Sequence, residues 1–278
     1  FKLIDHFKPE HMSSLSRRDA LKALGISIGS SMLPLSSWAT NDQGERIYLP
    51  EFSSSFVPDK PITVITCGAG SRGNVYGNYA VQYPAQLDVV GVAEPIAIRN
   101  ERYAKKHAIK DENRFKTWED VFKRPKFADA ILITTPDNLH YGPCMKALEM
   151  GYHVLLEKPI SPSEKECRDI LALAKKTGKI VAVCHVLRYA PYFEEMRNIM
   201  QSGVLGKVVS VQHFEQIEHT HMSHSYVRGN WHNSKETTPI ILAKSCHDLD
   251  ILRWMIGKES KSIHALGDVS WFKKANAP

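Results

Sequence analysis

A glycine-rich turn lies between a short apolar run and an amphipathic one, and it limits the folds that the chain can adopt. Residues 62–67, ITVITC, have the length and character of a buried strand, and they lead directly into Gly68-Ala69-Gly70-Ser71-Arg72-Gly73. A helix is expected from Asn74 onward. In that context, G-x-G-x-x-G is typical of the first strand–turn–helix unit of a dinucleotide-binding domain. Gly68 permits the tight turn, Gly70 lets the backbone approach a pyrophosphate, and Gly73 lets the helix pack on the strand.

An acidic residue follows the next predicted strand. That strand covers 87–93 and ends at Glu94, about twenty residues beyond the last glycine, where a carboxylate accepts hydrogen bonds from an adenosine ribose. This favours NAD over NADP, because a 2′-phosphate would meet the charge of Glu94 unfavourably. Arg99 lies close enough in sequence to keep NADP open as the less favoured cofactor. The alternative is that Glu94 is an ordinary exposed residue at a strand end.

Strand-like and helix-like patterns then alternate, which predicts an α/β Rossmann domain with a parallel sheet over residues 61–185. Further strands are expected at 128–134, 152–156 and 180–184, and helices at about 139–150 and 164–176. Loops at the carboxyl ends of such strands border the ligand. The residues predicted to contact the cofactor are Gly68, Gly70, Ser71, Arg72, Gly73, Asn74, Glu94, Thr135, Pro136, Asn138, His140, Glu157, Lys158, His185 and Arg188.

The N-terminal segment has the features of an export signal. Ser16-Arg17-Arg18-Asp19-Ala20-Leu21-Lys22 precedes the apolar stretch 23–35, and Ser37-Trp38-Ala39 offers small residues for a signal peptidase. The segment resembles a twin-arginine signal, which implies passage through the twin-arginine translocation machinery to the periplasm or beyond. An amphipathic first helix is the alternative, but its glycines and Pro34 disfavour it. We therefore expect a targeting segment over 1–39 and a linker over 40–60.

Composition excludes several classes of protein. No apolar run reaches the roughly 18 to 20 residues of a membrane span, and the net charge of +6 is not gathered into a basic face of the kind that binds nucleic acid. The five cysteines show neither a C-x-x-C pair nor zinc-ligand spacing. The histidine-rich stretch 213–232 lacks i, i+4 pairs and a diagnostic acidic triad, although Glu215 and Glu218 are nearby, so no metal site is predicted.

Four segments resemble a known family. They are the glycine turn at Gly68, TTPDNLH at 134–140, GYHVLLEKP at 151–159 and VLRYAPYFEEMR at 186–197. With these segments the chain resembles the glucose-fructose oxidoreductase and inositol dehydrogenase family, the Gfo/Idh/MocA type, over about residues 61–260. The resemblance implies a second α/β domain, here 186–278, with an open and mostly antiparallel sheet whose face covers the nicotinamide. Strands of that domain are expected at 206–218 and 261–266.

The resemblance also implies catalytic roles for Lys158 and His247. Lys158 would lie near the reacting carbon, and His247, in a helix of the second domain, would act as general acid or base. The chemistry agrees, since oxidation of an alcohol by hydride transfer also releases a hydroxyl proton, and an ammonium stabilises the developing alkoxide. Taken alone, His247 would be interpreted as a core histidine and Lys158 as a strand-end lysine.

The chain departs from the family at two positions. Ala243 stands where many members carry Asp one turn before the histidine, and Lys244 is the candidate to take over part of that task. His185 stands where the family often has Asn. Trp231 offers a flat surface on which a sugar ring could stack, so Trp231 and His232 join Lys158 and His247 as predicted substrate residues.

These observations predict an exported NAD-dependent oxidoreductase that acts on a sugar or cyclitol. One alternative is a glycoside hydrolase that keeps NAD tightly bound and uses transient oxidation and elimination. Another is a non-enzymatic sugar-binding protein that retains the dinucleotide structurally. Because the family's second domain extends well beyond residue 278, we expect the chain to be a C-terminally truncated fragment of a protein that forms homo-oligomers when full length.

Overall fold

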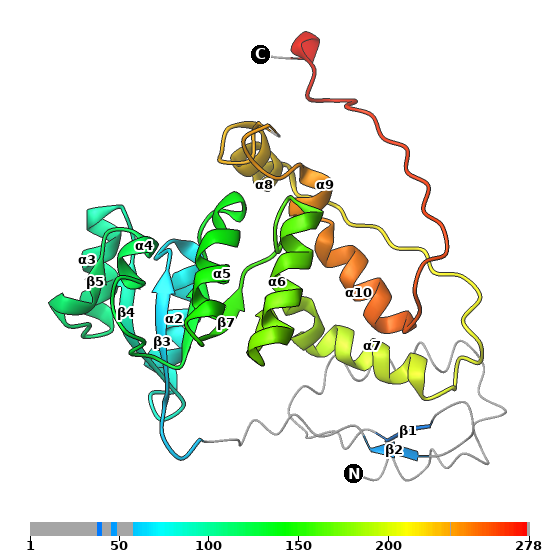
Figure 1. The fold of residues 1–278 in the computed structure, drawn as a ribbon. Coiled ribbons are helices and arrows are strands. Elements are labelled where there is room, and N and C mark those ends of the chain that lie inside the picture. Colours follow the sequence, from blue (N-terminus) through cyan, green and yellow to red (C-terminus); the bar gives the residue numbers. More distant parts are fainter. Residues whose placement is uncertain (1–37, 41–45, 49–57, 234, 277–278) are drawn as a thin grey trace.

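The computed structural model describes residues 38–40, 46–48, 58–233 and 235–276 (Figure 1). The predicted twin-arginine motif and most of the predicted linker therefore lie outside the described residues. Within those two segments, β1 (Trp38–Thr40) and β2 (Arg46–Tyr48) pair antiparallel, with Trp38 opposite Tyr48. This short strand pair was not predicted.

The main body of the molecule is a six-stranded parallel sheet in the order β5-β4-β3-β6-β7-β8. Counted from β3, this is the doubly wound order 3-2-1-4-5-6, which confirms the predicted Rossmann domain. The direction of winding reverses between β3 and β6, and ligands bind at such a switch point. The strands are β3 (Ile62–Cys67), β4 (Leu87–Ala93), β5 (Arg114–Phe115), β6 (Ala130–Ile133), β7 (His153–Leu156) and β8 (Val181–Val183).

Helices cover both faces of this sheet. One buried cluster includes Ile131, Leu148 and Leu156 and joins the sheet to α5 and α6, while another includes Val89 and Tyr103 and joins it to α2 and α3. Apolar side chains alternate between these clusters along the strands, as expected for a sheet buried on both faces. The helices are α2 (Ser71–Gln82), α3 (Ala97–Lys106), α4 (Trp118–Val121), α5 (Tyr141–Glu149) and α6 (Glu164–Thr177), with 3-10 turns η2 (Asp111–Asn113) and η3 (Asp137–Leu139).

Strands β3 and β4 have the predicted bounds, and the other elements differ at their ends. Helix α2 begins at Ser71 rather than Asn74, because Gly70 has the extended backbone of an N-cap and the following residues are already helical. The glycine motif therefore overlaps the first helical turn. The short edge strand β5 was not predicted, since two residues carry no detectable pattern.

The C-terminal half is helical where it packs on the Rossmann domain. Its predicted strands at 206–218 and 261–266 are wrong, because both segments lack a paired neighbour among the described residues. The described residues therefore do not show the mostly antiparallel sheet that the resemblance implies. A strand requires a partner for its backbone hydrogen bonds. The elements of this half are η4 (Val186–Tyr189), α7 (Pro191–Gln201), α8 (His219–His221), the π-helix η5 (Met222–Val227), α9 (Ile240–Ala243), α10 (Cys246–Ile256) and η6 (Lys274–Asn276). No helix in the described ranges is long and apolar enough to span a membrane.

Candidate functional site

The glycine turn lies at the switch point between β3 and β6. Gly68 has φ +95, and a Cβ there would lie 2.7 Å from the carbonyl oxygen of Thr134. A Cβ on Gly73 would lie 2.2 Å from the carbonyl oxygen of Gly68, so neither position tolerates a side chain. Asn74 braces the turn by donating its amide to the carbonyl oxygens of Ala69 and Gly70, at 3.0 and 2.9 Å.

Gly70 differs from its two neighbours in the motif because no protein atom lies close to it. The nearest atom to a Cβ built there would be Nη1 of Arg99, at 3.9 Å. The N–H groups of the first turn of α2, on residues 71–73, precede the first bonded N–H of Asn74 and have no acceptor within the helix, as in helix N-termini that bind anions. Open space, free N–H groups and a guanidinium together fit the pyrophosphate of a dinucleotide.

Glu94 is buried and holds the turn from the next strand. Its carboxylate accepts the N–H of Ala69 at 2.8 Å and the N–H of Ile96 at 3.0 Å. The side chain is therefore not the ordinary exposed strand-end residue of the alternative interpretation, since only 4% of the residue is accessible. Each carboxylate oxygen has a second acceptor position, which is what a ribose hydroxyl would need.

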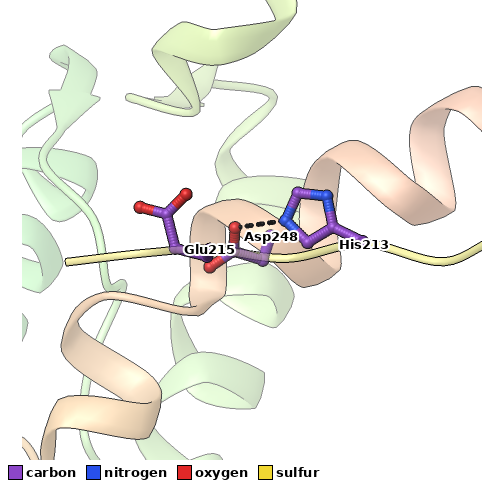
Figure 2. Close-up of side chains that lie close together, drawn as sticks. All are labelled: His213, Glu215 and Asp248. Atoms are coloured by element: carbon purple, nitrogen blue, oxygen red, sulfur yellow. Dashed lines mark hydrogen bonds and ion pairs between the residues drawn. The ribbon is translucent and has the colours of Figure 1, made fainter.

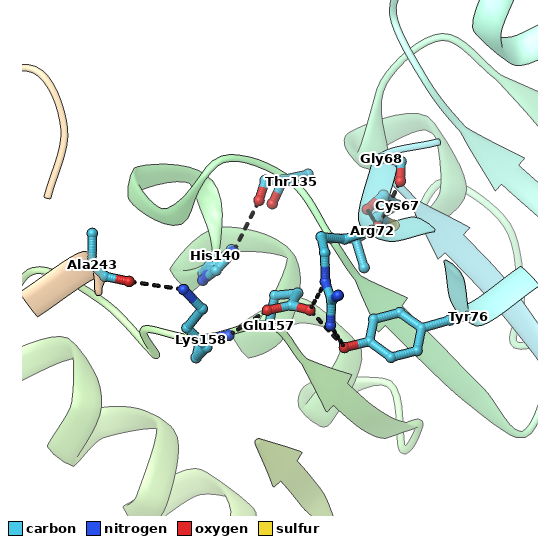
Figure 3. A network of polar contacts seen from close by, with 10 residues as sticks. Cys67, Gly68, Arg72, Tyr76, Thr135, His140, Glu157, Lys158 and Ala243 are labelled. Atoms are coloured by element: carbon cyan, nitrogen blue, oxygen red, sulfur yellow. Dashed lines mark hydrogen bonds and ion pairs between the residues drawn. The ribbon is translucent and has the colours of Figure 1, made fainter. Parts of the chain in front are cut away.

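Glu157 connects the second strand exit to α2. Its Oε1 accepts from Nε of Arg72 at 2.7 Å and from the hydroxyl of Tyr76 at 2.6 Å, and Oε2 accepts the N–H of Lys158 at 3.0 Å (Figure 3). Burial would by itself lower the pKa of Arg72, but the hydrogen bond and charge of Glu157 leave that pKa raised. Arg72 and Glu157 thus hold each other in place, and their ion pair joins the glycine motif to the loop that follows β7.

His140 joins the two loops that border the switch point. It is 1% exposed, and its ring nitrogens face the carbonyl oxygens of Pro159 at 2.8 Å and Thr135 at 3.0 Å. The hydroxyl of Thr135 in turn donates to the carbonyl oxygen of Leu139 at 3.2 Å. His140 therefore acts on a ligand only through these loops, which it holds at a fixed separation.

Lys158 reaches across to the C-terminal half. Its Nζ donates to the carbonyl oxygen of Ala243 at 2.8 Å, and Figure 3 shows the side chain extended from the strand exit toward α9. Ala243 is the last residue of α9, so its carbonyl has no partner within that helix. At the position where many members of the family that the sequence resembles carry Asp, this chain thus still supplies an acceptor, in the form of a backbone oxygen.

His185 and His247 meet beside Lys158. Their rings lie 6.0 Å apart at 80°. Burial first, and then the charges of Lys158, His185 and Lys244, lower the pKa of His247 to about 4, so the ring is neutral at pH 7. Burial also lowers the pKa of His185, although the carboxylate of Asp250 opposes that shift.

A second polar cluster flanks this group. His213 and Asp248 share a hydrogen bond of 2.7 Å, and Nζ of Lys244 lies 2.8 Å from Oε1 of Glu215. Figure 2 shows the side chains of His213, Glu215 and Asp248 close together. One nitrogen or oxygen atom of each lies within 4.8 Å of those of the other two, a spacing compatible with a bound cation. The charges of Glu215 and Lys244 instead balance each other within the protein.

The predicted substrate loop is tied to a cofactor loop. Nε1 of Trp231 donates to Oδ2 of Asp137 at 2.9 Å, and Nδ2 of Asn138 donates to the carbonyl oxygen of Glu236 at 3.3 Å. Trp231 therefore lies over the loop that contains Thr135 and Pro136. His232 is exposed and faces its own loop, where Nδ1 lies 2.7 Å from the carbonyl oxygen of Gly229.

Sequence reasoning did not identify several residues that complete this site. One of them is Asp250, whose carboxylate oxygens lie 2.7 and 2.5 Å from the guanidinium of Arg188 in a two-point ion pair. The spacing of Asp250 three residues after His247 was the available signal for a shared helix face. The other residues found only in the structure are Tyr76, Asp137 and Asp248, and the structure pairs Glu215, which the sequence shows near the histidine-rich stretch, with Lys244.

Comparisons with known proteins agree with this geometry. Residues 62–185 match the model of the oxidoreductase family with the NAD-binding Rossmann fold, and residues 193–275 match the GFO/IDH/MocA C-terminal domain. The chain is 26% identical over 204 residues to scyllo-inositol 2-dehydrogenase (NAD(+)) of Bacillus subtilis, covering 73% of this chain and 56% of that protein. It is 25% identical over 148 residues to 2,7-anhydro-N-acetylneuraminate hydratase of Escherichia coli, covering 53% and 39%.

A solved structure shares the fold. The WlbA dehydrogenase of Chromobacterium violaceum, in complex with NADH and UDP-GlcNAcA, superimposes with a TM-score of 0.61 at 19% identity, over 72% of this chain and 56% of that one. The predicted cofactor, NAD, is confirmed by the family model. The turn at the switch point and the loops that follow the strands agree with these family matches. The chain belongs to the Gfo/Idh/MocA family of NAD-binding oxidoreductases.

Proposed function

We propose that this chain is part of an NAD-dependent oxidoreductase that oxidises or reduces a CH–OH group of a sugar or cyclitol. The observation that carries the proposal is the convergence of Lys158, which follows β7, and His185, which follows β8, with His247 of α10. Glu157, next to Lys158, binds Arg72 of the glycine motif. The similarity to an inositol dehydrogenase supports the substrate class. The chain spans about half the length of that relative, so the activity of the whole protein is part of the proposal.

Such a reaction removes a proton from the substrate hydroxyl and creates a negative charge on its oxygen, and the site has a residue for each. Bound NAD⁺ supplies the hydride acceptor. His247, neutral at pH 7, takes the hydroxyl proton of the substrate, and the ammonium of Lys158 stabilises the alkoxide that develops as that proton leaves. The bond from Lys158 to the carbonyl oxygen of Ala243 holds the ammonium at the boundary between the two halves. Trp231, fixed by Asp137, offers a flat wall against which a sugar ring stacks.

We propose further that the protein is exported and forms homo-oligomers. The twin-arginine motif at Arg17 and Arg18 supports export. A pathway that carries folded cargo would let the protein acquire its dinucleotide before translocation. Fractionation of cells that express the full-length protein, with Arg17→Lys and Arg18→Lys together as the comparison, tests this. Equal export of both versions would contradict it.

A reaction without net redox change is the second candidate. One relative of this chain is a hydratase, whose reaction leaves no net oxidation or reduction. This similarity supports the alternative function, a glycoside hydrolase that uses tightly bound NAD. A sugar-binding protein without catalysis is less favoured, because Lys158 and His247 are present together beside the cofactor turn.

Two measurements separate these candidates. Native mass spectrometry of the purified full-length protein identifies the retained nucleotide. Nicotinamide absorbance is then followed against product release with a panel of sugars, cyclitols and aryl glycosides. Stoichiometric NADH accumulation supports the oxidoreductase, whereas sustained leaving-group release without net NADH supports the hydrolase. Retention of sugar without any turnover would support the binding protein.

A further inference from the structure

Two segments face each other across the boundary between the halves, and each carries a histidine and a charged residue. Helix α10 presents His247 and Asp250 on one side, as expected for positions i and i+3. The loop after β8 presents His185 and Arg188 toward them. Four ionisable side chains from distant parts of the sequence therefore form one group.

The ring nitrogens of this group are unusual. Nδ1 of His185 and Nδ1 of His247 are both buried, and neither has a hydrogen-bond partner among the described residues. Such atoms are costly to bury and are commonly reserved for a ligand or a proton. Nδ1 of His185 lies 3.8 Å from Oδ2 of Asp250, too far for a hydrogen bond but close enough for an ion pair if the ring is protonated.

The surrounding charges differ between the two rings. His247 is close to the cations Lys158 and Lys244, with Glu157 as the nearby anion. His185 is also affected by Lys158, Arg188 and Glu157, but it has Asp250 beside it. The side chain of Asp250 is 12% exposed, so water screens its carboxylate weakly. A positive charge is therefore more stable on His185 than on His247.

We propose that His185 and Asp250 form a proton-relay pair, which receives from His247 the proton that the substrate hydroxyl releases. This inference rests on the proposed function. In the oxidation direction the substrate O–H and C–H bonds break and its C=O bond forms: the C–H hydrogen leaves with the electron pair of that bond as hydride to NAD⁺, which is reduced, and the hydroxyl proton goes to His247. The proton then passes to His185 through a water molecule between the two rings, whose centroids lie 6.0 Å apart, so that Asp250 stabilises the imidazolium and His247 becomes neutral again. In the reduction direction the same proton returns.

The placement of the proton is tested without turnover. Histidine side-chain NMR of the NAD-loaded full-length protein follows each ring as the pH is lowered. We expect His185 to become protonated at a higher pH than His247, and Asp250→Asn to move the titration of His185 to lower pH, because the carboxylate that favours the imidazolium is gone. His264→Asn, at an exposed histidine outside the site, should change neither ring. An unchanged His185 titration in Asp250→Asn would overturn the pairing.

Kinetics test the relay itself. His185→Asn keeps a polar side chain but cannot carry the proton, so we expect kcat to fall roughly tenfold or more, with KM within a few-fold. Added imidazole should restore part of kcat in His185→Asn and leave His264→Asn unaffected. Unchanged kcat, or a loss that imidazole and pH do not alter, would overturn the relay. Inactivity of the unsubstituted protein would count against the proposed function alone, because the NMR measurement assesses the pair separately.

Discussion

The Rossmann half and the C-terminal half use their apolar residues differently. Both buried clusters lie in the first half, whereas among its described residues the second half contributes only Ala243, Ile251 and Met255 to the buried apolar set. Large side chains such as Val209 and Trp271 remain exposed there, at 92% and 69%. A parallel sheet with helices on both faces completes its own core, while the second half forms helices where it contacts the first. The chemistry that we propose lies at that contact.

Glycine-to-alanine substitutions should show the largest difference between the two halves in NAD binding and in unfolding free energy. Gly73→Ala places a Cβ 2.2 Å from the carbonyl oxygen of Gly68, so α2 must move away from β3 and the pyrophosphate cradle is lost. We expect no detectable NAD binding by calorimetry and a clear loss of unfolding free energy. Gly267→Ala, where a Cβ meets nothing within 4 Å, is the matched control. NAD binding by Gly73→Ala equal to that of the control would contradict the assignment of the turn.

A leucine pair tests the difference in packing. Leu148 is fully buried in α5, so Leu148→Ala should lower the unfolding free energy by about 2–5 kcal/mol. Leu266 is fully exposed, and Leu266→Ala should change it by less than about 0.5 kcal/mol. Urea denaturation measures both. Similar losses at the two positions would mean that the segment around Leu266 is packed in solution and that the contrast between the halves is wrong.

Much of the first half could be predicted from sequence, and the reason is local. The turn at Gly68 and the alternation of strands with helices depend on residues close in the chain, and β3 and β4 matched their predicted bounds. The predicted strands at 206–218 and 261–266 depended on partners that a local pattern does not specify. A two-residue strand such as β5 is too short to give any pattern.

The site shows the same division. Gly68, Gly70, Gly73 and Lys158 could be located from motifs, because each motif fixes their positions within one turn or loop. The bonds from Lys158 to Ala243 and from Trp231 to Asp137 join residues more than eighty positions apart. Such contacts are decided by packing of the two halves. The sequence therefore identifies these side chains as candidates, and the structure is needed to show which of them contact each other.

Lys158 and His247, which lie where the two halves meet, should affect turnover strongly and NAD affinity only slightly. Lys158→Ala and His247→Ala should each lower kcat by roughly 10²-fold or more and leave NAD affinity within a few-fold, because charge stabilisation and proton transfer count chiefly in the transition state. Stopped-flow absorbance and NAD titration measure the two quantities. Lys146→Ala, at an exposed surface ion pair on α5, serves as the control. Full activity in the Lys158→Ala, His247→Ala double variant would contradict both proposed reactions.

The smallest expected effect is a shift in pH dependence caused by Lys244. Its charge is one of those that lower the pKa of His247, behind burial, Lys158 and His185, so removing it lets that pKa rise from about 4. The base must be neutral to accept a proton, and the acid limb of the kcat/KM profile for oxidation should therefore move to higher pH in Lys244→Ala. Glu215→Gln should move the limb the other way, because Lys244 loses its counter-ion at 2.8 Å and acts more strongly on the histidine. Shifts in the same direction for both variants would show that Lys244 acts by packing the C-terminal half rather than by its charge.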